Sequence, residues 1–259
     1  MSYGEVEHFA AMVAGCESFN TGDVQAPDAR YALSVLKLHA NDMGLVAGQE
    51  GFLDSIKKGA QTIKQWFLSL VRAIKDFLQG SKTAVQAKEL AKAESEHDKW
   101  LKERGKTTED LNTKKAIIVK ETFEEPVRLA VALEKEINEV DDRKGFEGNN
   151  LNKMHISLGR GVANDIFHLL DVPVDRFHYV TDFKEVLDKI NDLNKAIGAL
   201  AQHAYREVST WEDETTQEEE RKSINKASYL LKSYTQMYKW LDGAASSSMK
   251  KISDLIQQQ

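Results

Sequence analysis

Apolar residues recur at steps of three and four along most of this 259-residue chain, and this spacing constrains its fold more than any other feature. Such steps place side chains on one face of an α-helix, whereas a half-buried strand alternates apolar and polar residues. The clearest run is Phe183, Val186, Leu187, Ile190, Leu193 and Ile197. Only three prolines occur, and no alternating β-branched run is bounded by hairpin signals. The sequence therefore predicts an all-α multi-helix bundle, formed as one domain or as two helical lobes.

The composition narrows the class of protein further. Hydrophobic residues make up 41% and charged residues 29%, which is typical of a folded protein rather than a disordered one. The net charge of −6 argues against a general nucleic-acid binder. With one cysteine, Cys16, the chain forms no internal disulfide and no cysteine-based zinc site. The acidic start and the lack of an apolar run of about 18 residues argue against a secretion signal or a spanning helix.

Residues 1–50 form a distinct acidic leader. Seven acidic residues stand against two basic ones there, a net charge of −5, which leaves −1 for the rest of the chain. Short helices are expected over Tyr3–Ala14 and Pro27–Asn41, because Pro27 suits a first helical turn and a Gly/Asp/Asn loop separates the two segments. The leader is thus expected to be helical and is a candidate propeptide.

Beyond the leader, the best internal boundary is 141–150, where charges, glycines and paired asparagines cluster. It separates a predicted helical lobe over 51–140 from a predicted C-terminal helical bundle over 151–259. The helices expected in these parts cover about 52–79, 81–104, 108–140 with a kink or fresh start at Pro126, 151–170, 181–210, 215–240 and, opened by Ala244–Ser248, a short last helix over 249–258.

The segment from Phe52 to Leu78 is a cationic amphipathic helix. Five basic residues stand against two acidic ones in it, and about ten large apolar side chains gather in one broad sector at 100° per residue. That sector contains Phe52, Ile56, Ile63, Phe67, Leu70, Ile74, Phe77 and Leu78, with Trp66 and Val71 beside it and Lys57, Lys64 and Lys75 along one border.

Such a helix has three interpretations. It lies in a membrane interface with its lysines reaching the headgroups, or it is a core helix of a bundle, or it is packed first and exposed later. Burying ten such side chains involves about 20 kcal/mol gross, so in each case something must cover this face.

A short pattern occurs twice, at Val13–Phe19 and at Val46–Phe52. Five of the seven positions are identical, and the changed Ser/Gly pair is small in both copies. The repetition is either meaningful or the similarity of two helix ends in an Ala/Gly-rich leader.

The second copy lies in Leu45-Val-Ala-Gly-Gln-Glu50 followed by Gly51-Phe-Leu-Asp, which resembles the processing sites of head proteins in large tailed bacteriophages. In that family a maturation protease cuts after such a glutamate and removes an N-terminal segment that directs the protein into the assembling head. The resemblance covers about residues 1–80. It implies cleavage between Glu50 and Gly51, with Glu17–Ser18 as a second, upstream site.

The resemblance also implies partners and a location. The partners are phage head proteins and the maturation protease, with packaged DNA or a membrane engaged after release; the location is the interior of the phage head and then the host cytoplasm. Loss of the leader removes a net charge of −5, which lowers the repulsion from genome phosphates. The alternative function is a membrane-active helical protein, a toxin or peripheral membrane factor, that uses helix 52–78.

An enzyme has little support from the sequence. The closest group to a metal site is His168, Asp171, Asp175 and His178, whose spacing passes through a turn and favours surface and capping roles. Ser157–Gly161 lacks the Lys-Ser/Thr ending of a phosphate loop. No catalytic residues, metal, cofactor or small-molecule substrate are therefore expected.

Overall fold

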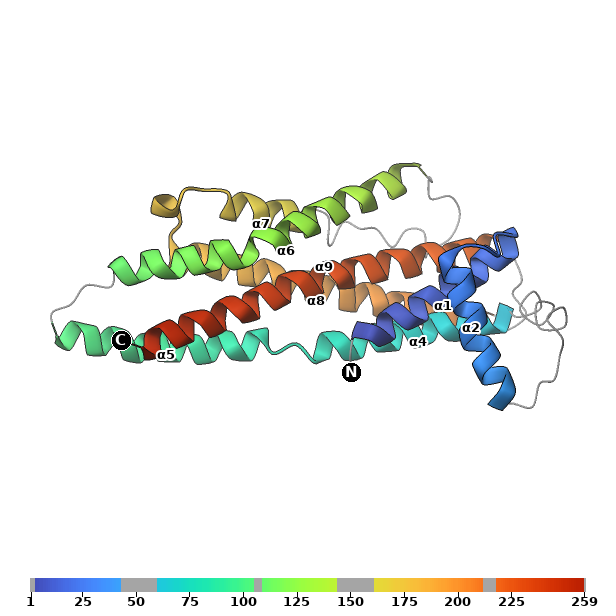
Figure 1. Cartoon of the computed structure of the whole chain (residues 1–259), viewed down its shortest axis with the longest axis horizontal. Coiled ribbons are helices and arrows are strands. Elements are labelled where there is room, and N and C mark those ends of the chain that lie inside the picture. The colour runs from blue at the N-terminus through green and yellow to red at the C-terminus, as the bar shows by residue number, and fades with distance from the viewer. Residues whose placement is uncertain (1–2, 43–59, 105–108, 144–160, 212–217, 259) are drawn as a thin grey trace. The chain divides into compact units, whose positions relative to one another are not determined.

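The computed structural model describes residues 3–42, 60–104, 109–143, 161–211 and 218–258 (Figure 1). Within these ranges the chain forms helices and no strand, which confirms the predicted all-α fold. The helices are α1 (Tyr3–Thr21), α2 (Pro27–Asp42), α4 (Ala60–Gln79), α5 (Thr83–Glu103), α6 (Glu109–Arg143), α7 (Val162–Leu170), the 3-10 helix η2 (Val174–Arg176), α8 (Tyr179–Ser209) and α9 (Glu218–Gln257).

The described residues belong to two compact units, and the long helices α8 and α9 contribute to both. The first unit contains α1, α2, α4, α8 from Gly198 onward and α9 up to Ser233. The second contains α5, α6, α7, η2, α8 up to Ile197 and α9 from Tyr234 onward. Each unit thus combines segments from both sides of the predicted boundary at 141–150.

The core of the first unit is built around α1. This helix contacts both α2 and α4, and it runs antiparallel along α4 (Figure 1). Gly15 of α1 lies directly against Ala32 of α2, and the small residues Ala10, Ala29 and Ala32 are all buried. Such residues let helix axes approach closely. The later part of α8 and the early part of α9 add further buried residues, namely Ala201, Ala204, Val208, Ile224, Ala227, Leu230 and Leu231.

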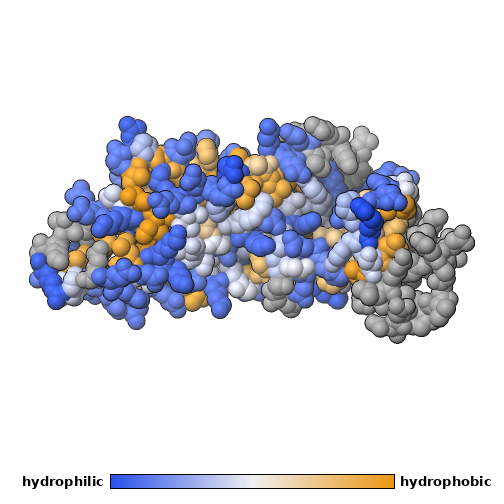
Figure 2. Space-filling model, viewed as in Figure 1, coloured by the Kyte–Doolittle hydropathy of each residue, from blue (hydrophilic) through white to orange (hydrophobic). Residues whose placement is uncertain are grey.

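The second unit has an aromatic core beside an ion pair whose lysine is buried. The Phe123 ring of α6 meets the Phe183 ring of α8 edge-on, and Tyr179 stacks on Phe183. Lys115 of α6 is buried and pairs with Glu94 of α5 at 2.7 Å. On the surface of this unit, hydrophobic residues gather over α6 and η2 (Figure 2).

Two helices, α9 and α1, differ from their predicted extents. α9 continues unbroken to Gln257, so the prediction of a separate last helix over 249–258 was wrong. The Ala244–Ser248 run stays helical because Ala244, Ala245 and Ser248 are buried, so packing outweighs the low helix propensity of serine. α1 extends to Thr21 rather than ending near Ala14. α6 runs past Pro126 as expected, and it does so as one helix without a fresh start there.

Candidate functional site

The amphipathic helix α4 buries its apolar face inside the first unit. Phe67, Leu70 and Ile74 have no exposed surface. The predicted face is buried at Ile63, Phe67, Leu70 and Ile74 and half-buried at Trp66 and Phe77. In the intact chain the described part of this helix is therefore a core element. The predicted residues Glu50, Gly51, Phe52, Ile56 and Lys57 lie outside the described residues.

The helix that packs along α4 is α1, the first helix of the leader. The Tyr3 ring at the start of α1 meets the Phe77 ring near the end of α4, with centroids 5.6 Å apart and planes at 66°. This edge-to-face geometry is one that aromatic pairs favour. The leader thus supplies part of the cover that the apolar face of α4 requires.

α1 is buried on two sides rather than one. At 100° per residue its buried residues form two stripes on different sides of the helix. One stripe contains Tyr3, Val6, Ala10 and Val13, and the other contains Met12, Cys16 and Phe19. A helix with two buried stripes is an integral core element of its unit, not a cap on the surface.

Cys16 lies in the second of these stripes. It is the single cysteine of the chain, and burial raises the pKa of its thiol to about 12. Because the thiolate is the reactive form, this side chain is inert near neutral pH while α1 stays packed.

The contact between α1 and α2 requires a glycine at position 15. A Cβ added to Gly15 would lie 2.4 Å from the Asp28 carbonyl oxygen and 2.6 Å from the Ala32 Cβ. A second link joins the same two helices, where the His8 Nδ1 and the Tyr31 hydroxyl oxygen are 2.8 Å apart. The two leader helices therefore pack as one hairpin.

The upstream candidate cleavage site, Glu17–Ser18, lies inside α1. The Thr21 hydroxyl donates to the carbonyls of both residues at 3.1 Å, which fixes the helical turn there. Burial raises the pKa of the Glu17 carboxyl above its ordinary value, and the positive charges of Arg221 and Lys222 on α9 offset only part of this rise. A protease binds its substrate in an extended form, so this peptide must leave the helix before it is cut.

The basic side chains of α4, both at the predicted border and on the polar side, are directed partly at the protein itself. The Lys64 ammonium donates to the Trp211 carbonyl at 2.6 Å. The Arg72 guanidinium donates to the Tyr205 hydroxyl at 3.2 Å and lies 5.7 Å from the centre of that ring. Lys75 is exposed.

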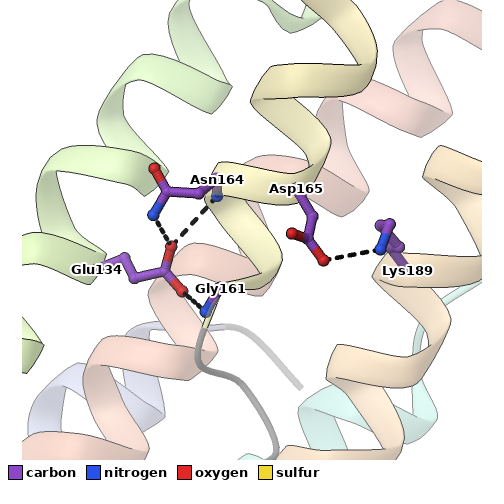
Figure 3. A network of polar contacts seen from close by, with 5 residues as sticks. All are labelled: Glu134, Gly161, Asn164, Asp165 and Lys189. Carbon is purple, nitrogen blue, oxygen red and sulfur yellow. Dashed lines mark hydrogen bonds and ion pairs between the residues drawn. The ribbon is translucent and has the colours of Figure 1, made fainter.

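A separate polar network in the second unit joins α6 to α7 (Figure 3). The Glu134 carboxylate is 1% exposed, and it accepts hydrogen bonds from the Gly161 amide, the Asn164 amide and the Asn164 side chain. It therefore binds the free amides at the start of α7, where the helix dipole favours a negative charge. Burial raises the pKa of Glu134 above its ordinary value, and the three hydrogen bonds offset only part of this rise.

The C-terminal end of α7 meets a positive charge from α6, the helix that also carries Glu134. The Lys120 ammonium on α6 donates to the carbonyls of Leu170 and Val172, where α7 ends. Asp165 on α7 also pairs with Lys189 on α8 at 2.8 Å (Figure 3). α7 is thus held at both termini by charges that complement its dipole. The sequence analysis missed this arrangement, because nothing in the local pattern links Glu134 to residues 27 positions away.

No group of three His, Cys, Asp or Glu residues in the described part of the chain is placed to hold a metal ion. Likewise, none of the described helices has the length and apolarity needed to cross a membrane.

No family model, curated protein or solved structure matches this chain. Its function is therefore inferred from its own residues and contacts, chiefly those between the leader and α4.

Proposed function

We propose that this chain is a structural or interaction protein of a bacteriophage head, packaged with the genome after cleavage between Glu50 and Gly51. In this proposal, residues 1–50 are a propeptide. The leader covers the apolar face of α4 before processing, and the mature protein engages DNA, a membrane or another head protein once the leader has left. Its partners during assembly are head proteins and the maturation protease.

The observation that carries the proposal is the packing of leader helix α1 along α4. The leader and α4 are joined by the segment that contains the Glu50–Gly51 pattern. A cut there breaks the covalent link between the acidic leader, which contains α1, and the amphipathic helix α4 that α1 covers. Losing that leader also removes −5 of the net charge of −6, which favours storage beside DNA.

The direct test is the N-terminus of the protein in purified mature particles. Mass spectrometry should find Gly51 as the first residue, and a Glu50→Gln variant should show no N-terminus at Gly51. The control is Glu7→Gln, the same change at an exposed leader position, which should be processed like the parent. An intact leader in mature particles of the parent would contradict the proposal.

A membrane-active protein is the second candidate, because α4 combines a wide apolar face with Lys64, Arg72 and Lys75. The apolar face is buried in the intact chain, so α1 must leave before α4 inserts. Sedimentation with anionic vesicles separates the two candidates. Binding by the unprocessed chain, lost in a folded Phe67→Glu variant, would favour the second candidate; no binding before processing fits the first.

A further inference from the structure

The way α1 is buried bears on what happens after the junction is cut. A segment held only by its covalent link diffuses away when the link is broken. A segment that buries much apolar surface stays bound, because leaving would return that surface to water.

α1 belongs to the second kind. Seven of its apolar residues are buried, on two sides of the helix, as in the interior of a domain. Val6 and Val13 have no exposed surface, and the Tyr3 ring contacts Phe77 on α4. Separation of α1 would also expose the part of α4 that it covers, which includes the Phe77 ring.

Polar groups add specificity to this contact. The Glu17 carboxyl on α1 is attracted by Arg221 and Lys222 at the start of α9. Because α2 is packed tightly on α1 through Gly15, the two leader helices leave or stay together. The leader is therefore held as one hairpin, chiefly by its buried apolar surface.

From these contacts we infer that residues 1–50 remain bound to residues 51–259 after the Glu50–Gly51 peptide is cut, with α1 as a helical ligand of α4. The position of the cut rests on the proposed function. Processing and uncovering of α4 are then separate events. The cut makes the leader exchangeable, and α4 becomes available to a partner only when α1 dissociates or is itself cleaved.

The test uses the full chain with the recognition sequence of a site-specific protease inserted between Glu50 and Gly51. After complete cleavage, size-exclusion chromatography at micromolar concentration should give one peak, and native mass spectrometry should find one leader per body. Elution of the leader apart from the body, whether the body stays folded or aggregates, would overturn the inference. Because the engineered cut does not depend on the natural protease, this result is independent of whether Glu50–Gly51 is processed in particles.

A matched pair of variants identifies the contact that retains the leader. Val13→Asp places a charge in the buried surface of α1, and Val24→Asp makes the same change at an exposed position of the leader loop. In chains whose helicity before the cut equals that of the parent, Val13→Asp should raise the dissociation constant of the leader by about tenfold or more relative to Val24→Asp. Equal retention in the two variants would show that α1 is not the ligand, and the parent measurement decides the matter if Val13→Asp does not fold.

Discussion

The Tyr3 ring, three residues into the chain, packs edge-on against the Phe77 ring at the far end of the amphipathic helix, with centroids 5.6 Å apart. This contact joins the start of the proposed propeptide to the helix that it covers. It makes the leader part of the core of the first unit. Several measurable properties of the chain depend on this arrangement.

Gly15 is the position at which the leader hairpin is most sensitive to added volume. Gly15→Ala should lower the free energy of unfolding by about 1–3 kcal/mol, because the new methyl group meets the Asp28 backbone oxygen. Gly198 in α8 is the matched control, since nothing lies within 4 Å of a Cβ placed there. Gly198→Ala should be neutral or stabilising by up to about 1 kcal/mol. Chemical denaturation measures both values, and equal effects would contradict the close contact.

Glu134 should be required for the docking of α7. Glu134→Ala leaves the amides of Gly161 and Asn164 without their acceptor, which should cost about 1–3 kcal/mol of stability. Hydrogen exchange in α7 should accelerate in parallel. The control is Glu121→Ala, at an exposed position of α6, the helix that carries Glu134. It should change stability by no more than about 0.5 kcal/mol. Unchanged exchange in α7 of the Glu134→Ala variant would argue against the capping role.

The same residue predicts a pH dependence with a definite sign. Burial holds the pKa of Glu134 above its ordinary value of 4.5, so the folded chain binds a proton more readily than the unfolded chain. The resulting stabilisation is fully present below pH 4.5 and is lost as the pH rises through the raised value. The parent should therefore lose stability relative to Glu134→Gln as the pH rises above 4.5. A difference that stays constant over this range would contradict the raised pKa.

The helical state of Glu17–Ser18 predicts an order of processing. In a time course with the maturation protease, the N-terminus at Gly51 should appear before one at Ser18, because the upstream peptide lies inside a packed helix. Mass spectrometry of samples taken during the reaction gives the order. An early Ser18 terminus in chains still joined at Glu50–Gly51 would mean that α1 opens readily in the intact protein.

How much of this could be read from the sequence differs between elements. The apolar steps along α8 and the sector on α4 are local patterns, so both helices were predictable. The continuation of α9 through Ala244–Ser248 was not, because it depends on the burial of Ala245 and Ser248 by other helices. The partner of α4 was equally hidden. The two stripes of α1 give no single apolar face, so its sequence does not indicate which helix it packs against.

The polar contacts were the least predictable part. The hydrogen bond from the Gly161 amide to Glu134 joins residues that only the fold brings together, and the helix expected over 151–170 did not indicate that α7 begins just after Gly161. The junction at Glu50–Gly51 shows the reverse case. It is a pattern of a few residues that the sequence supplies, and it lies outside the described residues.

The central claim, that the leader is packed into the protein before it is removed, is tested most directly by the reactivity of Cys16. This is the only thiol of the chain, and a pKa of about 12 against an ordinary 9.0 implies on the order of 1,000-fold fewer thiolates at pH 8. In the purified intact chain, iodoacetamide should therefore modify Cys16 at least roughly 100-fold more slowly than in urea. Modification in the intact chain at the rate seen in urea would contradict the account, because it would mean that α1 is not held against the rest of the protein.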